Sequence, residues 1–185
     1  MAQPANPIVT IHMQDGGKMK LELFPDPAPI TTANFTELIE SGHYDGLTFH
    51  RVVEGFMIQG GSKNNSCAGK DADFSIRGEF ARNGINTGIS HTRGTISMAR
   101  SGHPDSAGTQ FFIMQQDGLF LDGDYAAFGR IIDSESLAVL DKIASVPTKS
   151  VREENRPLTP QVIERITYEP GGYNRPAPMR IFSED

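Results

Sequence analysis

The side chains best suited to chemistry lie in four short segments that mix hydrogen-bond donors with large apolar groups. Residues 49–61 interleave Arg51 and Gln59 with phenylalanine, valine, methionine and isoleucine, and residues 97–100, 109–114 and 120–129 share this mixture. An arginine is always charged, and its planar guanidinium carries several donors. No covalent nucleophile is visible in these segments. Their chemistry would therefore be apolar contact combined with directed hydrogen bonding.

Other kinds of site are not supported. The Gly69-Lys70 pair lacks the upstream glycine and the following serine or threonine of a phosphate-binding loop, and no G-x-S-x-G sequence is present. The five histidines are scattered and the acidic residues are dispersed. Neither a metal site nor a paired-carboxylate hydrolase is indicated, and we expect no cofactor. Cys67 is the one cysteine, cannot form an internal disulfide, and is interpreted as incidental.

The composition narrows the class of protein further. A chain of 185 residues suits one domain, or a domain with a tail. A formal net charge of −6 argues against a general nucleic-acid binder, which needs clustered lysine and arginine. No apolar run approaches the roughly 18 residues of a membrane span, and residues 1–7 lack the features of a secretory signal. We therefore expect a cytoplasmic monomer in a reducing compartment.

Short strands separated by turns must position the four segments. Residues 8–13 and 18–24 read as a hairpin around the turn at residues 15–17. Further strands are expected at residues 48–53, 56–59, 94–99, 111–115, 127–132 and 162–168. A helix capped by Thr31 or Thr32 is expected to end at Ser41, and a second helix is expected over residues 134–145.

This element count favours a mainly β protein and is compatible with a closed antiparallel barrel with helices over its ends. Nineteen glycines and twelve prolines indicate many turns, in keeping with that class. Residues 63–73 are polar and are interpreted as a long loop. We expect one domain over residues 1–168, followed by a tail at residues 169–185 that lies on the surface or is loose.

The four segments, in this order and at these spacings, resemble the cyclophilin family of peptidyl-prolyl cis-trans isomerases. The likeness covers about residues 8–168, and residues 78–80, 91–94 and 105–108 look most like the bacterial single-domain members. The resemblance implies a closed eight-stranded antiparallel barrel capped by two helices. It also implies isomerisation of X-Pro bonds in peptides and in folding proteins, with a chaperone role and without a cofactor or metal.

The resemblance assigns roles to single positions. Arg51 matches the catalytic arginine, and Gln59 matches the glutamine that orients it and contacts substrate. Ala99 and Arg100 match a segment that pairs with the peptide backbone, and Ser101 and Thr109 fall where the family has a second pocket, for the residue two before proline. The walls of the proline pocket are matched by Phe56, Met57, Phe112 and Leu121, and the further groove positions are Gln110, Phe120 and Tyr125.

Three of these positions depart from the best-known members. Phe120 stands where many have a tryptophan that donates its indole N–H to cyclosporin, so binding of this drug is predicted to be weakened. Tyr125 replaces a histidine, keeping an aromatic ring and a hydroxyl. Arg100 replaces an asparagine, which costs little if backbone groups perform the role.

The proposed reaction suits these residues. Rotation about the peptide C–N bond has a barrier of about 18–20 kcal/mol, because resonance gives the bond double-bond character. An apolar pocket that grips the proline ring, with a donor that meets the nitrogen lone pair as it localises, would act only in the transition state. A rate increase of about 10⁵-fold requires roughly 7 kcal/mol.

Three alternatives stay open at this point. Arg51 could be a structural arginine paired with Glu54 or Glu79. The protein could be a proline-directed binding module or holdase with little turnover, although an intact Arg51 favours the enzyme. The tail could belong to a regulatory subunit and dock a partner.

Overall fold

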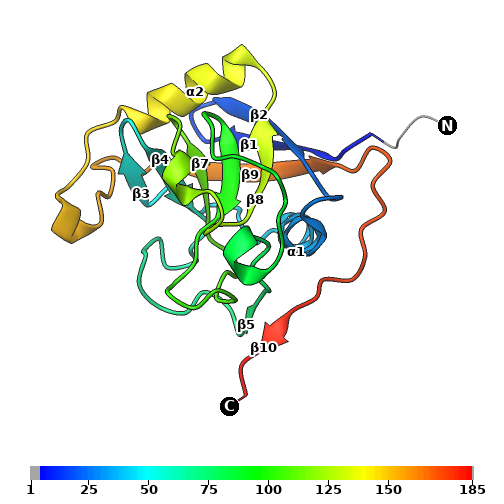
Figure 1. The fold of residues 1–185 in the computed structure, drawn as a ribbon. Helices are drawn as coiled ribbons and strands as arrows, with labels where there is room; N and C mark the ends of the chain where they lie inside the picture. Colours follow the sequence, from blue (N-terminus) through cyan, green and yellow to red (C-terminus); the bar gives the residue numbers. More distant parts are fainter. Residues whose placement is uncertain (1–4, 185) are drawn as a thin grey trace.

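The computed structural model describes residues 5–184, and its main body is one curled antiparallel sheet of eight strands (Figure 1). The sheet order is β3-β4-β7-β6-β8-β2-β1-β9. The strands are β1 (Ile8–Met13), β2 (Lys18–Leu23), β3 (Arg51–Val53), β4 (Met57–Gly60), β6 (Thr95–Met98), β7 (Phe111–Met114), β8 (Ala127–Ile131) and β9 (Ile163–Glu169). The expectation about a secretory signal rests largely on residues 1–4, which lie outside the described part.

The two ends of this sheet, β3 and β9, approach one another without forming a continuous ladder. An isolated antiparallel bridge joins Thr48 to Val162, and the Phe49 amide donates to the Gln161 carbonyl at 3.0 Å. The expected strand over residues 48–53 begins only at Arg51, because residues 48–50 connect to the chain before β9 by single contacts. The protein is thus mainly β, with one strongly curled sheet. The closure of this sheet into a barrel stays a prediction.

Helix α1 (Pro29–Glu40) begins earlier than expected, and the prediction that Thr31 or Thr32 caps it is wrong. Pro29 occupies the first turn, where a missing N–H costs nothing. The cap comes from Glu79, distant in sequence and almost fully buried. Its carboxylate accepts from the amides of Ile30 and Thr31, at 3.2 and 2.6 Å, and from the Thr31 hydroxyl at 2.7 Å.

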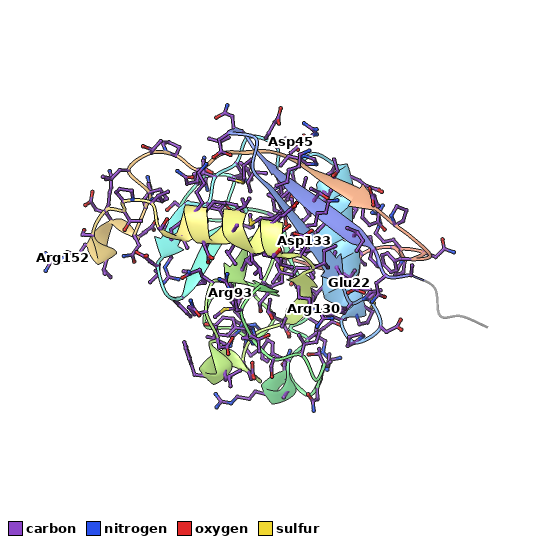
Figure 2. All side chains as sticks on the ribbon, turned by 90° about the horizontal axis from the view of Figure 1, so that it is seen from above. Glu22, Asp45, Arg93, Arg130, Asp133 and Arg152 are labelled. Atoms are coloured by element: carbon purple, nitrogen blue, oxygen red, sulfur yellow. The ribbon has the colours of Figure 1, made fainter. Side chains whose placement is uncertain are left out.

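Helix α2 (Ser134–Ala144) lies across one face of the sheet, as expected to within a residue (Figure 2). Asp133, labelled at its beginning, accepts the Ser136 amide at 2.7 Å and so satisfies one of the unpaired donors of the first turn. Beneath the helix, Arg93 forms an ion pair with Asp141 on α2, with 2.6 Å between Nη1 and Oδ1. This pair joins the helix to the segment before β6.

A second, two-stranded sheet pairs β5 (Phe74–Ser75) with β10 (Ile181–Phe182), near the C-terminus. Three short 3-10 helices complete the described structure: η1 (Ala81–Asn83), η2 (Leu119–Leu121) and η3 (Val151–Glu153). Residues 63–73 contain no helix or strand, as expected. Among residues 5–184, none of the helices has the length and apolar character needed to cross a bilayer.

Candidate active site

Four side chains lie in one row across neighbouring strands. The register pairs Arg51 on β3 with Gln59 on β4, Gln59 with Phe112 on β7, and Phe112 with Ser97 on β6. Successive residues of a strand point to opposite faces, so the residues next to this row face the other way. Val52, Ile58, Phe111 and Ile96 accordingly pack into the main core. The row is thus on the outer face of the sheet.

An apolar cluster separate from the main core lies along this row. Met57, Phe112 and Leu121 form it together with Met114, and all four are at most 8% exposed. Phe56, Ala99, Tyr125 and Val53 pack against the cluster and are partly exposed. The Tyr125 ring meets the Phe112 ring edge to face, with 5.8 Å between centroids. Phe111 belongs to the main core and Phe112 to this second cluster, as the alternation of side chains along a strand requires.

A chain of hydrogen bonds runs from the guanidinium into the loop over residues 63–73. Arg51 Nη1 donates to Gln59 Oε1 at 3.2 Å, and Gln59 Nε2 donates to Gln110 Oε1 at 2.9 Å. Gln110 Nε2 then donates to Asp71 Oδ2 at 2.6 Å. Asp71 Oδ1 accepts from the Ser62 hydroxyl at 2.7 Å. Because each amide both accepts and donates, the chain fixes the orientation of both glutamines.

His91 lies behind the apolar cluster, fully buried, and its ring stacks on Phe112 with 6.0 Å between centroids. Its Nδ1 lies 2.8 Å from Asp122 Oδ1, and its Nε2 lies 2.9 Å from the Ser97 hydroxyl. Burial lowers the pKa of His91, and the Asp122 carboxylate opposes this shift only in part. The neutral ring therefore supports Phe112 from behind.

Most of the residues assigned from the sequence line one open cavity of about 1060 Å³. Twelve of them lie along it: Arg51, Phe56, Met57, Gln59, Ala99, Arg100, Ser101, Thr109, Gln110, Phe112, Leu121 and Tyr125. Phe120 is placed outside the lining. Its ring is 73% exposed and stacks on Phe56 at 5.7 Å between centroids, so it extends the apolar rim.

The side chain of Arg100 is used within the protein. Its guanidinium lies between the rings of Phe80 and Tyr125, at 4.9 and 4.8 Å from their centroids. It donates to the carbonyls of Asp124 and Ser101, at 2.9 and 3.0 Å. These contacts give Arg100 a structural role around the groove wall.

The two second-pocket positions differ in burial. Thr109 is buried, and its hydroxyl donates to the Gly61 carbonyl at 2.9 Å, whereas Ser101 is exposed. Gly61 has a φ of +93°, and a Cβ there would lie 2.6 Å from the Thr109 carbonyl oxygen. Only glycine permits this close approach of the two segments.

The structural alternative for Arg51 is not supported. The ion pairs found among residues 5–184 do not include Arg51, and Glu79 is engaged by α1. Within the same residues there is no cluster of three or more histidine, cysteine or acidic side chains that could hold a metal ion.

The structure adds cavity residues that the sequence reasoning missed. Asp71 and its neighbours line one side, together with Glu154 and residues 181–183 of the tail. Their only signal in the sequence is a polar loop and a C-terminal segment, neither of which indicates a groove. They reach the cavity through tertiary contacts alone.

Comparisons with known proteins show which family the chain resembles. A family model described as cyclophilin type peptidyl-prolyl cis-trans isomerase/CLD matches residues 8–168. A peptidyl-prolyl cis-trans isomerase of Acinetobacter baylyi is 39% identical over 150 residues, spanning 78% of this chain and 76% of the relative. One of Helicobacter pylori is 44% identical over 127 residues, spanning 69% and 75%.

Solved structures show the same likeness. A cyclophilin type peptidyl-prolyl cis-trans isomerase of Cryptosporidium parvum superposes with a TM-score of 0.76 at 29% identity, covering 89% of this chain and 98% of that one. The structure of that protein in the presence of the dipeptide Ala-Pro superposes with a TM-score of 0.74 at 29% identity, covering 88% and 98%.

Proposed function

The chain belongs to the cyclophilin-type peptidyl-prolyl cis-trans isomerases, and we propose that it accelerates X-Pro rotation without covalent chemistry, through Arg51 beside an apolar proline pocket. The observation that carries this proposal is the register of β3 and β4. It places the Arg51 guanidinium, on β3, against Gln59 on β4. Gln59 in turn lies opposite Phe112 on the next strand, β7. A donor and an apolar pocket are thereby held on neighbouring strands.

The apolar cluster suits a pyrrolidine ring. Met57, Phe112 and Leu121 form a preorganised surface, because they pack against one another and His91 stacks on Phe112 from behind. Holding the ring leaves the acyl side of the X-Pro bond free to rotate. As the bond twists, the prolyl nitrogen becomes pyramidal and its lone pair localises. A guanidinium N–H directed at that lone pair interacts more strongly with the transition state than with either planar isomer.

Backbone groups beside the cavity suit an extended peptide. The Ala99 amide is already bonded to the Gln110 carbonyl at 3.0 Å, but the hydrogen bonds found among residues 5–184 do not use the Ala99 carbonyl or the Arg100 amide. These two groups belong to one trans peptide unit and point in opposite directions, so an extended peptide lying on one side can pair with one of them. This supports a role for residues 99 and 100 through their backbone, with Arg100 replaceable.

Several finer properties belong to the same proposal. We expect proline-containing peptides and folding proteins as substrates, since slow X-Pro isomerisation limits many folding reactions. A cytoplasmic monomer, a division at residue 168, a closed barrel and weakened cyclosporin binding stay predictions from the sequence. The alternative of a binding module with little turnover is not favoured, because the guanidinium and its orienting glutamine are both in place.

The test compares wild type with Arg51→Ala and Arg51→Lys in a peptide X-Pro isomerisation assay, with peptide binding measured in parallel. We expect kcat/KM to fall at least about a hundredfold in Arg51→Ala, with binding changed only a few-fold, because the donor acts in the transition state. Arg51→Lys keeps the charge but not the planar fork and should recover little. Binding without acceleration in wild type would leave a proline-recognition module.

A further inference from the structure

The C-terminal residues 170–184, here named the strap, run back over the surface from the end of β9 to the side of the molecule where β5 lies (Figure 1). They lie beyond the matched residues 8–168. The path passes α1 and ends with β10 beside β5. The strap therefore runs from the outer surface of α1 to the edge of the cavity.

Two arginines fasten the strap to α1. Arg175 forms an ion pair with Glu40, and Arg180 forms one with Glu37. Arg180 Nε also donates to Asn34 Oδ1 at 3.0 Å. The Arg180 side chain is only 16% exposed, and partial burial reduces the screening that weakens surface ion pairs. These contacts hold the strap in one place.

The end of the strap closes on the segment before and within β5. The Arg180 guanidinium stacks on the Phe74 ring at 4.0 Å from its centroid, and Phe182 meets the same ring edge to face at 6.3 Å. Ile181 and Phe182 pair with Ser75 and Phe74 in an antiparallel register. Lys70 Nζ donates to the Ser183 hydroxyl at 3.0 Å, on the loop that supplies Asp71.

This end of the strap borders the cavity. Ile181, Phe182 and Ser183 line it, and Ile181 and Phe182 are 48% and 66% exposed. β5 adjoins the Thr109 segment, since a Cβ on Gly108 would lie 3.3 Å from the Phe74 carbonyl oxygen. Asn34 links the strap to the Thr109 segment, because its Nδ2 donates to the Gly108 carbonyl at 2.8 Å while its Oδ1 accepts from Arg180.

We propose that the strap forms a wall of the substrate groove and selects peptides with a bulky apolar side chain two or three residues before the proline. This inference rests on the proposed function, which places the proline against Phe112, and on the resemblance, which assigns Thr109 to the pocket for the residue two before it. Two exposed apolar side chains on a fixed backbone offer contact area at little entropic cost. A glycine or serine at the same substrate position would gain nothing from them.

The experiment uses the full chain and a series of peptides with glycine, alanine, leucine or phenylalanine two or three residues before proline. It compares wild type, the double variant Ile181→Ala/Phe182→Ala, and Arg180→Ala, which releases the strap with both apolar side chains intact. Leu158→Ala is the matched control, since Leu158 is 61% exposed and lies outside the cavity lining. Both kcat/KM and the dissociation constant of each peptide are measured.

We expect wild type to prefer phenylalanine or leucine over glycine by about three- to tenfold. Both strap variants should lose this preference, because their phenylalanine and leucine peptides react more slowly. Leu158→Ala should keep the wild-type preference. Equal discrimination in wild type and in the double variant would overturn the inference. If wild type accelerates no peptide, the proposed function fails instead, and the dissociation constants still decide whether the strap selects.

Discussion

Arg51 and Gln59 lie directly opposite one another on β3 and β4, and a hydrogen bond of 3.2 Å joins the guanidinium to the amide oxygen. The amide of Gln59 is itself oriented, because it donates to Gln110, which donates to Asp71. A carboxylate is acceptor-only when ionised, so it sets the direction of the whole chain. The orientation of Arg51 therefore depends on Asp71, which is three side chains away along these hydrogen bonds.

Removal of the Asp71 carboxylate is expected to lower kcat about three- to tenfold with little change in KM. In Asp71→Ala the Gln110 amide keeps only the Ser66 carbonyl as an acceptor, at 3.5 Å, so Gln59 and Arg51 are less firmly positioned for the transition state. Asp71→Asn keeps an acceptor oxygen and should recover most of the rate. Steady-state isomerisation kinetics provide the measurement.

The matched control for this prediction is Asp73→Ala, an exposed carboxylate two residues away on the same loop. It should leave kcat within about twofold of wild type. An equal loss in both variants would point to a general effect of charge or loop order, and the positioning role would be wrong.

Loss of the Glu79 carboxylate is expected to destabilise the protein by about 1–3 kcal/mol, because buried donors lose their partner. Glu79 accepts from two amides and one hydroxyl at the start of α1. Urea unfolding of Glu79→Gln and Glu79→Ala gives the free energy of unfolding. Glu135→Gln, an exposed acid in the first turn of α2, should cost only a few tenths of a kcal/mol. Similar losses at both positions would refute the capping role.

The free energy of unfolding is expected to fall as the pH drops below about 6.5. Burial lowers the pKa of His91, and burial likewise lowers that of His50, so the unfolded chain takes up protons that the folded protein resists. The free energy of unfolding is therefore highest above the pKa that these histidines have in the unfolded chain. It falls as the pH drops from there toward their lower pKa in the folded protein. The slope is at most about 1.4 kcal/mol per pH unit for each histidine.

Urea unfolding at several pH values between 5 and 8 checks this dependence, with His91→Asn as the comparison. An asparagine side chain does not titrate in this range, so the slope between pH 6.5 and 5.5 should be shallower in the variant than in wild type, whatever the stability at pH 8. Parallel profiles in the two proteins would exclude His91 as a source of the slope.

The roles of Arg51, Gln59 and Phe112 are assigned by resemblance, and their placement in one row follows from local rules. Alternation along β7 separates Phe111 from Phe112, and the spacing of Arg51 and Gln59 around a short turn places them opposite one another. Both features depend on a few neighbouring residues. The order of motifs then identified the family to which the strands belong.

The parts that escaped prediction depend on contacts between distant segments. Thr31 and Thr32 are good capping residues by type, but Glu79 performs that task from outside the helix, and Pro29 lets the helix begin earlier. Asp71 sits in a loop with no periodic pattern, and it gains its role only when Gln110 reaches it. From the sequence the strap is a tail that lies on the surface or is loose, and its place is set only by the contacts of Arg180 with Glu37 and Phe74.

Phe120→Trp is expected to tighten inhibition by cyclosporin about three- to tenfold. Phe120 is 73% exposed beside Phe56 at the rim of the cavity, and phenylalanine has no donor. An indole there adds an N–H and more apolar area, and one net hydrogen bond contributes about 0.5–1.5 kcal/mol. The inhibition constant is measured against each variant's own kcat/KM. Leu119→Trp, which adds an indole at the adjacent exposed position, is the matched control. If both variants gain equally, or neither gains, the residue at position 120 does not set the response to the drug.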